Sequence, residues 1–521
     1  MSAINTSTPS VHKGRVTYQA MKTKRGRLAA IMAGLVVSNT QENPLLATDV
    51  YKMGHMEQSC PETEKVYSHL VARSGKNFEK TVFLGLQYYL QVYLSKKLEP
   101  WMAEEFLNAR KHILGISSEE VTKKIRALAE LGYFPIKIKA VPEGTVMSVK
   151  NVLMTITNTK PGFGWVVGFL ESLIIKIWDA ITVGACAYHY RTLVDEMWDK
   201  TVDDDMHFLK AFAVHDFGYR GCKTEEEAGL SGMAFLAGYG GLGSDTVPAL
   251  PFIVRHYGSD MSKPIMLSVP ASEHSVMCSF GREDELAAFK HMLMLYKTGI
   301  VSIVSDTFNV YRVLTEFAAI LKPIILARPE GSKVVFRPDS GNPEYIICGD
   351  PNAPVGSNEW KGAIRLLDEM FGSTVNKKGY KVLNPKVGLI YGDGMYFERF
   401  ERTLRRLEVM GYAASNLVIG VGGILRGHSR DSMGFAIKAT YVIVNGEERA
   451  IEKDPITDPG KKSLKGLMVL ERNDAGNYVT TDEVDWARED GGILVNAFED
   501  GEILREYEWG EVCANVNAGR A

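Results

Sequence analysis

The sequence of 521 residues lacks the features that mark several classes of protein. Its six cysteines are scattered, with no C-x-x-C pair and no metal-ligand spacing, so neither a disulfide framework nor a zinc site is indicated. The formal net charge of -3 gives no general attraction to nucleic acid or to a membrane surface. No apolar run is long enough to span a bilayer. We therefore expect a soluble protein of a reducing, cytoplasmic compartment, without nucleic-acid or membrane partners.

One apolar run needs separate treatment. Leu28 to Val37 follows a cluster of Lys and Arg residues, as in a secretory signal. The run is short, lies far from Met1 and has no clear A-x-A cleavage site. We expect residues 1–40 to be a loosely ordered leader that serves as an extension or packs on a partner, and a targeting role is the alternative.

The rest of the chain divides by its hydrophobic pattern. The length indicates two to four structural units. Residues 41–205 together with 434–521 are expected to form an α+β domain, because alternating apolar runs such as Phe435 to Val444 indicate strands beside helical patterns. Residues 206–433 are expected to form a β/α barrel-like domain with parallel strands. The predicted fold class is therefore α/β with a second, α+β domain.

The barrel prediction depends on a repeated order of strand, polar turn and helix. Six short apolar strands each end in a polar or glycine-rich cluster. The expected strand ends are Val214, Met266, Val304, Phe336, Ile390 and Val418. In a β/α barrel the carboxyl ends of the strands surround one pocket, so these clusters should meet.

The turn His215 to Gly221 (HDFGYRG) carries the most suggestive chemistry. Phe217 offers a face on which a planar ring can stack, and Arg220 offers a bidentate donor for phosphate or carboxylate. Gly218 and Gly221 would let the backbone approach a ligand closely. Taken alone, the same residues also fit a buried aromatic beside a surface ion pair. Thr224 and Glu227 then form a capping box that opens a helix.

Two further clusters fit a phosphorylated sugar. Asp339 and Asp393 could accept hydrogen bonds from vicinal hydroxyls or hold a hydrated Mg²⁺. Gly422 and Gly423, followed by Arg426 and Arg430, could form a backbone cradle for phosphate closed by a cation. A tight turn with solvated arginines is the alternative interpretation.

Together these motifs resemble the nicotinamide phosphoribosyltransferases, which are type II phosphoribosyltransferases. The resemblance runs from NPLLATDVYK near residue 43, through the DP-x-x-DP-x-K-x-S-x-KG loop, to about residue 510. HDFGYRG, SDTV, SVPASEHS, SIVSD, RPDSGNP, GDG and GVGG-x6-RD occur between them in family order. The resemblance implies that nicotinamide and phosphoribosyl pyrophosphate react to give nicotinamide mononucleotide and pyrophosphate, in the salvage of NAD.

The resemblance also implies how the pyridine is bound. Phe217 matches one slice of an aromatic sandwich, and Tyr51 matches the other, contributed by the partner subunit of a homodimer with its active site at the subunit interface. Asp245 matches the acceptor for the carboxamide nitrogen, which would favour the amide over the acid. A surface or core tyrosine and a helix N-cap aspartate are the alternatives for Tyr51 and Asp245.

The remaining roles are carried over in the same way. Ser302 and Arg337 match donors around the carboxamide oxygen, and Ser268 lies at an adjoining strand end. The residues that match phosphate and pyrophosphate contacts are Arg220, Arg430, Arg73, Lys438, Gly422 and Gly423. The residues that match the ribose and metal side are Asp306, Asp339, Gly392 and Asp393, with Asp306 and Asp339 expected to hold Mg²⁺.

His274 matches a histidine that is phosphorylated while the family hydrolyses ATP as an auxiliary substrate. On its own it would be assigned as a packed or capping histidine. The chain departs from the family at Phe212 and Ala213, where relatives can carry tyrosine and lysine, so some pyrophosphate or ATP contacts are in doubt. The turn also reads GVGG where relatives can carry a longer glycine run.

Two other functions stay open at the level of sequence. One is a phosphoribosyltransferase for nicotinate or another pyridine. The other is a non-catalytic binding protein built on the same fold.

Overall fold

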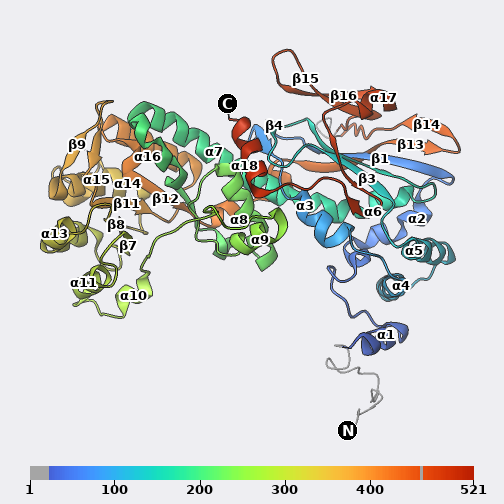
Figure 1. The fold of residues 1–521 in the computed structure, drawn as a ribbon, viewed down its shortest axis with the longest axis horizontal. Coiled ribbons are helices and arrows are strands. Elements are labelled where there is room, and N and C mark those ends of the chain that lie inside the picture. The colour runs from blue at the N-terminus through green and yellow to red at the C-terminus, as the bar shows by residue number, and fades with distance from the viewer. Residues whose placement is uncertain (1–22, 458–461, 521) are drawn as a thin grey trace, which may run out of the picture. The chain divides into compact units, whose positions relative to one another are not determined.

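A computed structural model describes residues 23–457 and 462–520. The chain forms two compact units, shown as a ribbon in Figure 1. The first, here the sheet unit, comprises the residues up to Trp178 and Arg430–Tyr507. The second, here the barrel unit, comprises Asp179–Ser429 and Glu508–Ala521. No helix within the described ranges has the length and apolar character needed to cross a membrane.

The sheet unit is built on a seven-stranded antiparallel sheet of order β14-β13-β1-β5-β3-β17-β18. The three N-terminal strands β1, β5 and β3 form the centre of this sheet, and strands from the C-terminal part of the chain flank them on both sides. The strands are β1 (Thr63–Ala72), β3 (Ile136–Ala140), β5 (Val152–Asn158), β13 (Phe435–Val444), β14 (Glu447–Ala450), β17 (Val495–Glu499) and β18 (Glu502–Ile503).

Helices and two small two-stranded sheets complete the sheet unit. Helix α6 packs on β1 and β5, because its apolar sequence is buried along most of its length. The helices are α1 (Lys24–Met32), α2 (His55–Gln58), α3 (Leu86–Tyr89), α4 (Pro100–Leu114), α5 (Glu119–Leu131), α6 (Gly164–Ile174) and α17 (Trp486–Asp490). The paired strands are β2 (Lys80–Val82) with β4 (Val146–Ser148), and β15 (Leu467–Arg472) with β16 (Tyr478–Val484).

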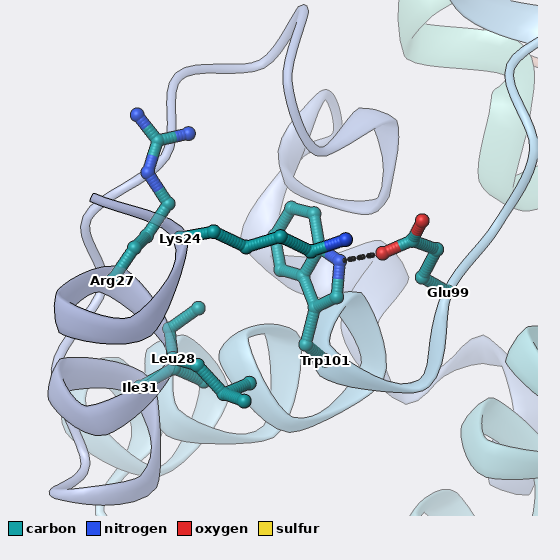
Figure 2. A pocket seen from close by; sticks show the side chains of 6 residues that line it. All are labelled: Lys24, Arg27, Leu28, Ile31, Glu99 and Trp101. Atoms are coloured by element: carbon teal, nitrogen blue, oxygen red, sulfur yellow. Dashed lines mark hydrogen bonds between the residues drawn. The ribbon is translucent and has the colours of Figure 1, made fainter. Parts of the chain in front are cut away.

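The described part of the expected leader contains an ordered helix. Thr23 caps α1 by accepting a hydrogen bond from the Gly26 amide at 3.0 Å. Helix α1 packs on α4 and leaves a pocket of about 440 Å³, into which Leu28, Ile31 and Trp101 point (Figure 2). The Trp101 indole donates to Glu99 at its edge. Residues 23–40 are therefore more ordered than expected, while residues 1–22 lie outside the described residues.

The barrel unit is built on a parallel sheet of order β6-β12-β11-β8-β7. Isolated parallel bridges continue this sheet from Asp216 to Ser244, from Gly243 to Leu267, and from Ala271 back to Ser302 of β7. The ring of strands is thereby nearly closed, which confirms the β/α barrel-like prediction. The strands are β6 (Val214–Asp216), β7 (Ile300–Val304), β8 (Lys333–Arg337), β11 (Val387–Tyr391) and β12 (Leu417–Val421).

Helices surround these strands, as Figure 1 shows for α11, α13, α15 and α16. Strands β7 and β12 have apolar sequences that are buried along most of their length, as expected when helices cover a parallel sheet. The helices are α7 (Trp178–Thr201), α8 (Glu225–Tyr239), α9 (Ala249–Tyr257), α10 (His274–Cys278), α11 (Glu285–Leu295), α12 (Val310–Arg312), α13 (Ala318–Leu326), α14 (Pro343–Cys348), α15 (Asn358–Phe371), α16 (Phe397–Val409) and α18 (Trp509–Ala518). Strands β9 (Ser373–Val375) and β10 (Lys381–Leu383) form a small hairpin.

The units divide at different residues from those expected at 205/206 and 433/434. Helix α7 belongs to the barrel unit because it crosses α8 closely: a Cβ added to Gly238 would lie 2.3 Å from the Gly184 carbonyl oxygen. The C-terminal helix α18 also packs on α8, and Tyr188 of α7 donates to the Gly519 carbonyl at 2.9 Å. These contacts could not be read from local sequence patterns.

Three local expectations were wrong in part. The apolar residues before Val214 form a 3₁₀-helix, Asp204–Phe212, and only Val214–Asp216 form the strand. The strand expected to end at Met266 is reduced to a single bridge at Leu267. The apolar pattern of Val82 to Leu94 predicts a helix, but this stretch contains the end of β2 and then α3 with a π-helical turn.

Candidate active site

Phe217 lies where the carboxyl ends of several barrel strands meet. Its amide donates to the Val421 carbonyl at 3.0 Å, so the turn after β6 is fixed to the end of β12. Its ring fills the space over two glycines: a Cβ at Gly420 would lie 2.0 Å from Cδ2, and one at Gly392 would lie 3.4 Å from Cε2. The same Cβ at Gly392 would lie 2.7 Å from Oδ1 of Asp339. The structure therefore brings together Phe217, Gly392 and Asp339.

Asp245 is held at the same end of the barrel. Its amide donates to the Asp216 carbonyl at 2.9 Å, and its exposed carboxylate accepts a hydrogen bond from the Ser268 hydroxyl. Helix α9 starts only at Ala249, with Pro248 at its N-cap, so the alternative of a helix N-cap for Asp245 is wrong. The carboxylate is free to accept from a ligand.

Ser302 and Arg337 lie on the neighbouring strands β7 and β8. Arg337 Nη2 donates to the Ser272 carbonyl at 2.6 Å, and the Ser272 amide donates to the Ser302 carbonyl at 3.0 Å. The Ser302 hydroxyl and Arg337 Nε are buried and have no partner within the described residues. Buried donors without partners are rare in folded proteins, and a ligand oxygen would satisfy them.

A group of carboxylates forms the adjoining part of the rim. Burial raises the pKa of Asp339, and the Asp306 and Asp393 carboxylates raise it further, against the opposing effect of Arg337. Tyr391 is a buried neighbour of this group. Burial and the carboxylates of Asp306, Asp339 and Asp393 raise the pKa of its hydroxyl, which donates to the Ser340 carbonyl at 2.7 Å. Tyr391 was not predicted, because a buried tyrosine inside an apolar strand carries no functional signal in sequence.

His274 belongs to this group. Its Nε2 lies 3.1 Å from Oδ1 of Asp306, and its side chain is 46% exposed whereas that of Asp306 is 4% exposed. Asp306 also accepts from Ser340. The imidazole is thus oriented by a carboxylate and open to solvent, which contradicts the alternative of a packed histidine.

The carboxylates suit a hydrated divalent cation better than a complete metal cage. No group of three or more His, Cys, Asp or Glu in the described ranges has the geometry to hold a metal. Mg²⁺ commonly takes one or two protein carboxylates, with water and substrate phosphate as its other ligands. Burial raises the pKa of Asp339, and the nearby carboxylates of Asp306 and Asp393 raise it further; a bound cation would reduce the repulsion among these three carboxylates. Asp306 and Asp339 therefore fit the expected ion.

The glycine turn after β12 is open at the surface. Gly423 is exposed and begins a short 3₁₀-helix, Gly423–Arg426, and Gly422 is half-buried. Arg220 is exposed on a 3₁₀-turn, Tyr219–Gly221, that packs on it. A Cβ at Gly221 would lie 2.8 Å from the Gly423 Cα, so the two turns touch through their backbones.

The expectation for Arg426 was wrong. Its side chain is completely buried and forms an ion pair with the equally buried Asp216, with 2.9 Å between Nη2 and Oδ2. It cannot be a solvated cation that closes the turn. It also occupies the space beside Gly218 and Gly221, where a Cβ would lie 3.0 Å from its Cζ and 3.3 Å from its Cβ respectively. These glycines therefore accommodate Arg426 and Gly423, not the approach of a ligand.

Four predicted residues belong to the sheet unit. Arg73 and Lys438 line a pocket of about 390 Å³ together with Lys150 and Lys462. Burial lowers the pKa of the Lys438 ammonium, and nearby Arg73 lowers it further. Burial and Lys438 together lower the pKa of His69, in the same pocket, to about 4. A bound phosphate would reduce the repulsion among these cations.

The other two are at the surface. Tyr51 is 62% exposed, and its ring meets His55 edge-on at 5.6 Å between centroids. A core position for Tyr51 is therefore excluded. Arg430 is exposed and pairs with its neighbour Asp431 at 2.6 Å.

The geometry can be compared with known proteins. The sequence model of the nicotinate phosphoribosyltransferase (NAPRTase) family matches residues 212–488. That of the nicotinamide phosphoribosyltransferase N-terminal domain matches residues 43–120. A nicotinamide phosphoribosyltransferase of Acinetobacter baylyi is 40% identical, with 90% of this chain and 96% of that protein covered. One of Xanthomonas campestris is 36% identical, covering 92% and 99%.

Solved structures share the fold at low sequence identity. A nicotinate-nucleotide pyrophosphorylase from Pyrococcus furiosus superposes with a TM-score of 0.55 and 16% identity, covering 93% of this chain and 97% of that one. Human nicotinic acid phosphoribosyltransferase gives 0.51 and 15%, covering 91% and 93%. The sequence relatives confirm the resemblance seen in the motifs, and the chain belongs to the nicotinamide phosphoribosyltransferases of the nicotinate phosphoribosyltransferase family.

Proposed function

We propose that the protein transfers the phosphoribosyl group of phosphoribosyl pyrophosphate to nicotinamide in NAD salvage. The observation that carries this proposal is the joint placement of Phe217, Asp245 and the Asp306–Asp339 rim at one end of a barrel, in a chain of this family. The pyridine nitrogen forms a bond to C1 of the ribose, the bond from C1 to the pyrophosphate oxygen breaks, and pyrophosphate leaves with that electron pair.

The residues divide between the two substrates. Phe217 stacks on the pyridine ring, and the unpaired donors Ser302 Oγ and Arg337 Nε suit the carboxamide oxygen. Asp339 and Asp393 face the sugar, where positive charge develops in the transition state. Gly422, Gly423 and Arg220 offer amides and a cation to phosphate. When bound, Mg²⁺ held by Asp306 and Asp339 would neutralise the pyrophosphate.

Asp245 favours the amide over the acid. A carboxylate accepts a hydrogen bond from a carboxamide nitrogen, but it repels the carboxylate of nicotinate. The exposed carboxylate of Asp245 therefore supports nicotinamide ahead of nicotinate, for which the family as a whole is named. Nicotinate phosphoribosyltransferase activity is the second candidate.

We further propose a homodimer in which the partner subunit's Tyr51 provides the second face of the pyridine slot. The exposure of Tyr51 supports this, because a large aromatic side chain at the surface is available to a partner. The cationic pocket around Arg73 and Lys438 would then bind the substrate phosphates. Sedimentation equilibrium tests whether the protein is a dimer. Mixing Tyr51→Ala with Phe217→Ala chains should restore part of the activity, because one site of each hybrid dimer keeps both aromatic residues. No restoration would contradict an active site shared between subunits.

ATP is proposed as an auxiliary substrate through His274. The half-exposed imidazole, oriented by Asp306, is suited to accept a phosphoryl group from ATP, with release of ADP and later hydrolysis to phosphate. His274→Asn should abolish stimulation by ATP while leaving ATP-independent turnover. Acid-labile phosphohistidine, detected by mass spectrometry, checks the intermediate, and its absence from wild-type protein would contradict the role.

The reaction itself is tested by incubating the protein with Mg²⁺, phosphoribosyl pyrophosphate and either pyridine, and measuring each mononucleotide by chromatography. We expect product from nicotinamide at far higher kcat/KM than from nicotinate. A preference for nicotinate would support the second candidate. No mononucleotide from either pyridine, with or without ATP, would instead support a non-catalytic binding protein.

A further inference from the structure

The side chain of Asp216 stabilises the turn that contains Phe217. It is the last residue of β6, and its carboxylate has both oxygens occupied. Oδ1 accepts from the Gly218 amide at 2.8 Å, and Oδ2 accepts from Arg426 Nη2 at 2.9 Å. The backbone of Phe217 is therefore bracketed by Asp216 on one side and by its own bond to Val421 on the other.

Arg426 is the last residue of the 3₁₀-helix that begins at Gly423, in the glycine turn after β12. Besides the bond to Asp216, its Nε lies 3.3 Å from the Cys222 sulfur, which follows the other end of the Phe217 turn. One guanidinium thus contacts the Phe217 turn at its beginning and at its end. Its Nη1 is buried and has no partner within the described residues, so no further contact competes with these two.

A buried ion pair is costly to form, because both charges lose their water. The side chains of Asp216 and Arg426 are each 0% exposed, so water does not stabilise either charge. The main contribution of the pair is therefore to fix the geometry of the segments that it joins. The glycines at 218 and 221 make room for it. Replacing one partner would leave a buried charge without compensation.

We propose that Arg426 is a positioning residue, which acts through Asp216 to hold the Phe217 turn in register with the Gly422–Gly423 turn. The inference rests on the proposed function, since the two turns then carry the pyridine and the sugar phosphate. Holding both reactants in register lowers the barrier of the chemical step more than it strengthens the binding of either substrate.

Arg426→Gln tests the inference, with Arg406→Gln as the matched control. Arg406 is another arginine of the barrel unit. Its side chain is 25% exposed, pairs with Glu344 at 3.3 Å and contacts the Gly349 carbonyl, away from the two turns. We expect Arg426→Gln to lower kcat at least about tenfold, with KM for each substrate within about threefold, since small misplacements of reactants are costly. Arg406→Gln should lower the melting temperature without this loss.

The order of action is tested by a double variant. If Arg426 acts through Asp216, the variant Asp216→Asn/Arg426→Gln should be no slower than the slower single variant. Effects that multiply would overturn the inference. Arg426→Lys keeps the charge and should recover part of kcat relative to Arg426→Gln. No recovery would show that the positive charge beside Asp216 does not position the Phe217 turn.

Hydrogen exchange gives a readout that does not need catalysis. In Arg426→Gln, amides of both residues 217–222 and residues 421–426 should exchange faster, with β8 unchanged. Faster exchange in residues 421–426 alone, or a kcat for Arg426→Gln no lower than for Arg406→Gln, would overturn the inference. Wild-type protein assayed in parallel separates a failure of the proposed function from a failure of this inference. If wild type forms no product, the proposed function is contradicted, and the hydrogen-exchange result alone decides whether Arg426 links the two turns.

Discussion

The ring of Phe217 rests on the backbone of Gly420, at a distance where no side chain can intervene. A Cβ at residue 420 would lie 2.0 Å from Cδ2 of the ring, far inside van der Waals contact. Strand β12 therefore sets the depth at which Phe217 presents its face. In the proposed site, Gly420 therefore positions the ring of Phe217 on which the pyridine would stack.

Gly420→Ala should displace the Phe217 ring and damage the pyridine slot. We expect KM for nicotinamide to rise about tenfold or more, with a smaller change for phosphoribosyl pyrophosphate, because the two substrates use different residues. Gly510→Ala is the matched control, because no atom lies within 4 Å of the added methyl group there. Equal nicotinamide KM values in the two variants would show that the ring position is not set by Gly420.

Asp245→Asn should weaken the discrimination between amide and acid. The neutral amide no longer repels nicotinate, so the ratio of kcat/KM for nicotinamide over nicotinate should fall about tenfold, which corresponds to about 1.4 kcal/mol. Competition assays with both pyridines measure this ratio directly. Asp205→Asn, at an exposed position of the 3₁₀-helix before β6, serves as the control. An unchanged ratio in Asp245→Asn would refute the assignment.

The acid limb of the pH–rate profile should report Asp339. Burial and the carboxylates of Asp306 and Asp393 raise its pKa, so it takes up a proton at higher pH than an ordinary aspartate. If ionised Asp339 is required, kcat/KM falls as pH decreases through this raised value. Asp393→Asn removes one like charge and should move the limb to lower pH, whatever its effect on the maximum. A limb that stays in place or moves to higher pH would exclude Asp339 as its source.

Asp179 should make the stability of the fold depend on pH. Burial raises its pKa to about 6, with Glu227 adding to the effect and Arg426 and Lys223 opposing it. Because the folded-state value exceeds the ordinary value of 3.8, the contribution of Asp179 to stability is fully present below pH 3.8 and is lost as pH rises through about 6.

Replacing Asp179 with Asn removes this titration. The variant should be more stable than wild type at pH 7.5, by roughly 1–2 kcal/mol, and should lose part of the pH dependence between about 4 and 6. Urea unfolding at several pH values measures both effects. Parallel curves for the two proteins would mean that Asp179 does not titrate in this range.

Much of the barrel could be predicted because its signals are local. Five of the six expected strand ends fall within or one residue from the ends of observed strands, since apolar β-branched runs followed by Gly, Asp or Ser are reliable markers of parallel strands. The capping box was confirmed in one half, with the Thr224 hydroxyl accepting from the Glu227 amide at 3.1 Å. Glu227 itself accepts from the Lys223 amide, one residue before the cap.

What could not be predicted depends on contacts between distant segments. The sequence shows Arg426 as a charged residue in a glycine-rich turn, and only the fold reveals that Asp216 faces it. The strand expected at Met266 is interrupted because its neighbours offer single bridges rather than a ladder. The proximity of Tyr391 to three carboxylates likewise results from the order of the strands, not from a local pattern.

The placement of β13 between β14 and β1 has a consequence for biosynthesis. During translation β1, β3 and β5 emerge long before β13 and β17, and the barrel segment emerges in between. Until then, β1 and β3 present open edges that are templates for wrong pairing. Nascent chains that stop after the barrel segment should thus require chaperones to protect the N-terminal strands. Completion of the seven-stranded sheet should be a late step in folding.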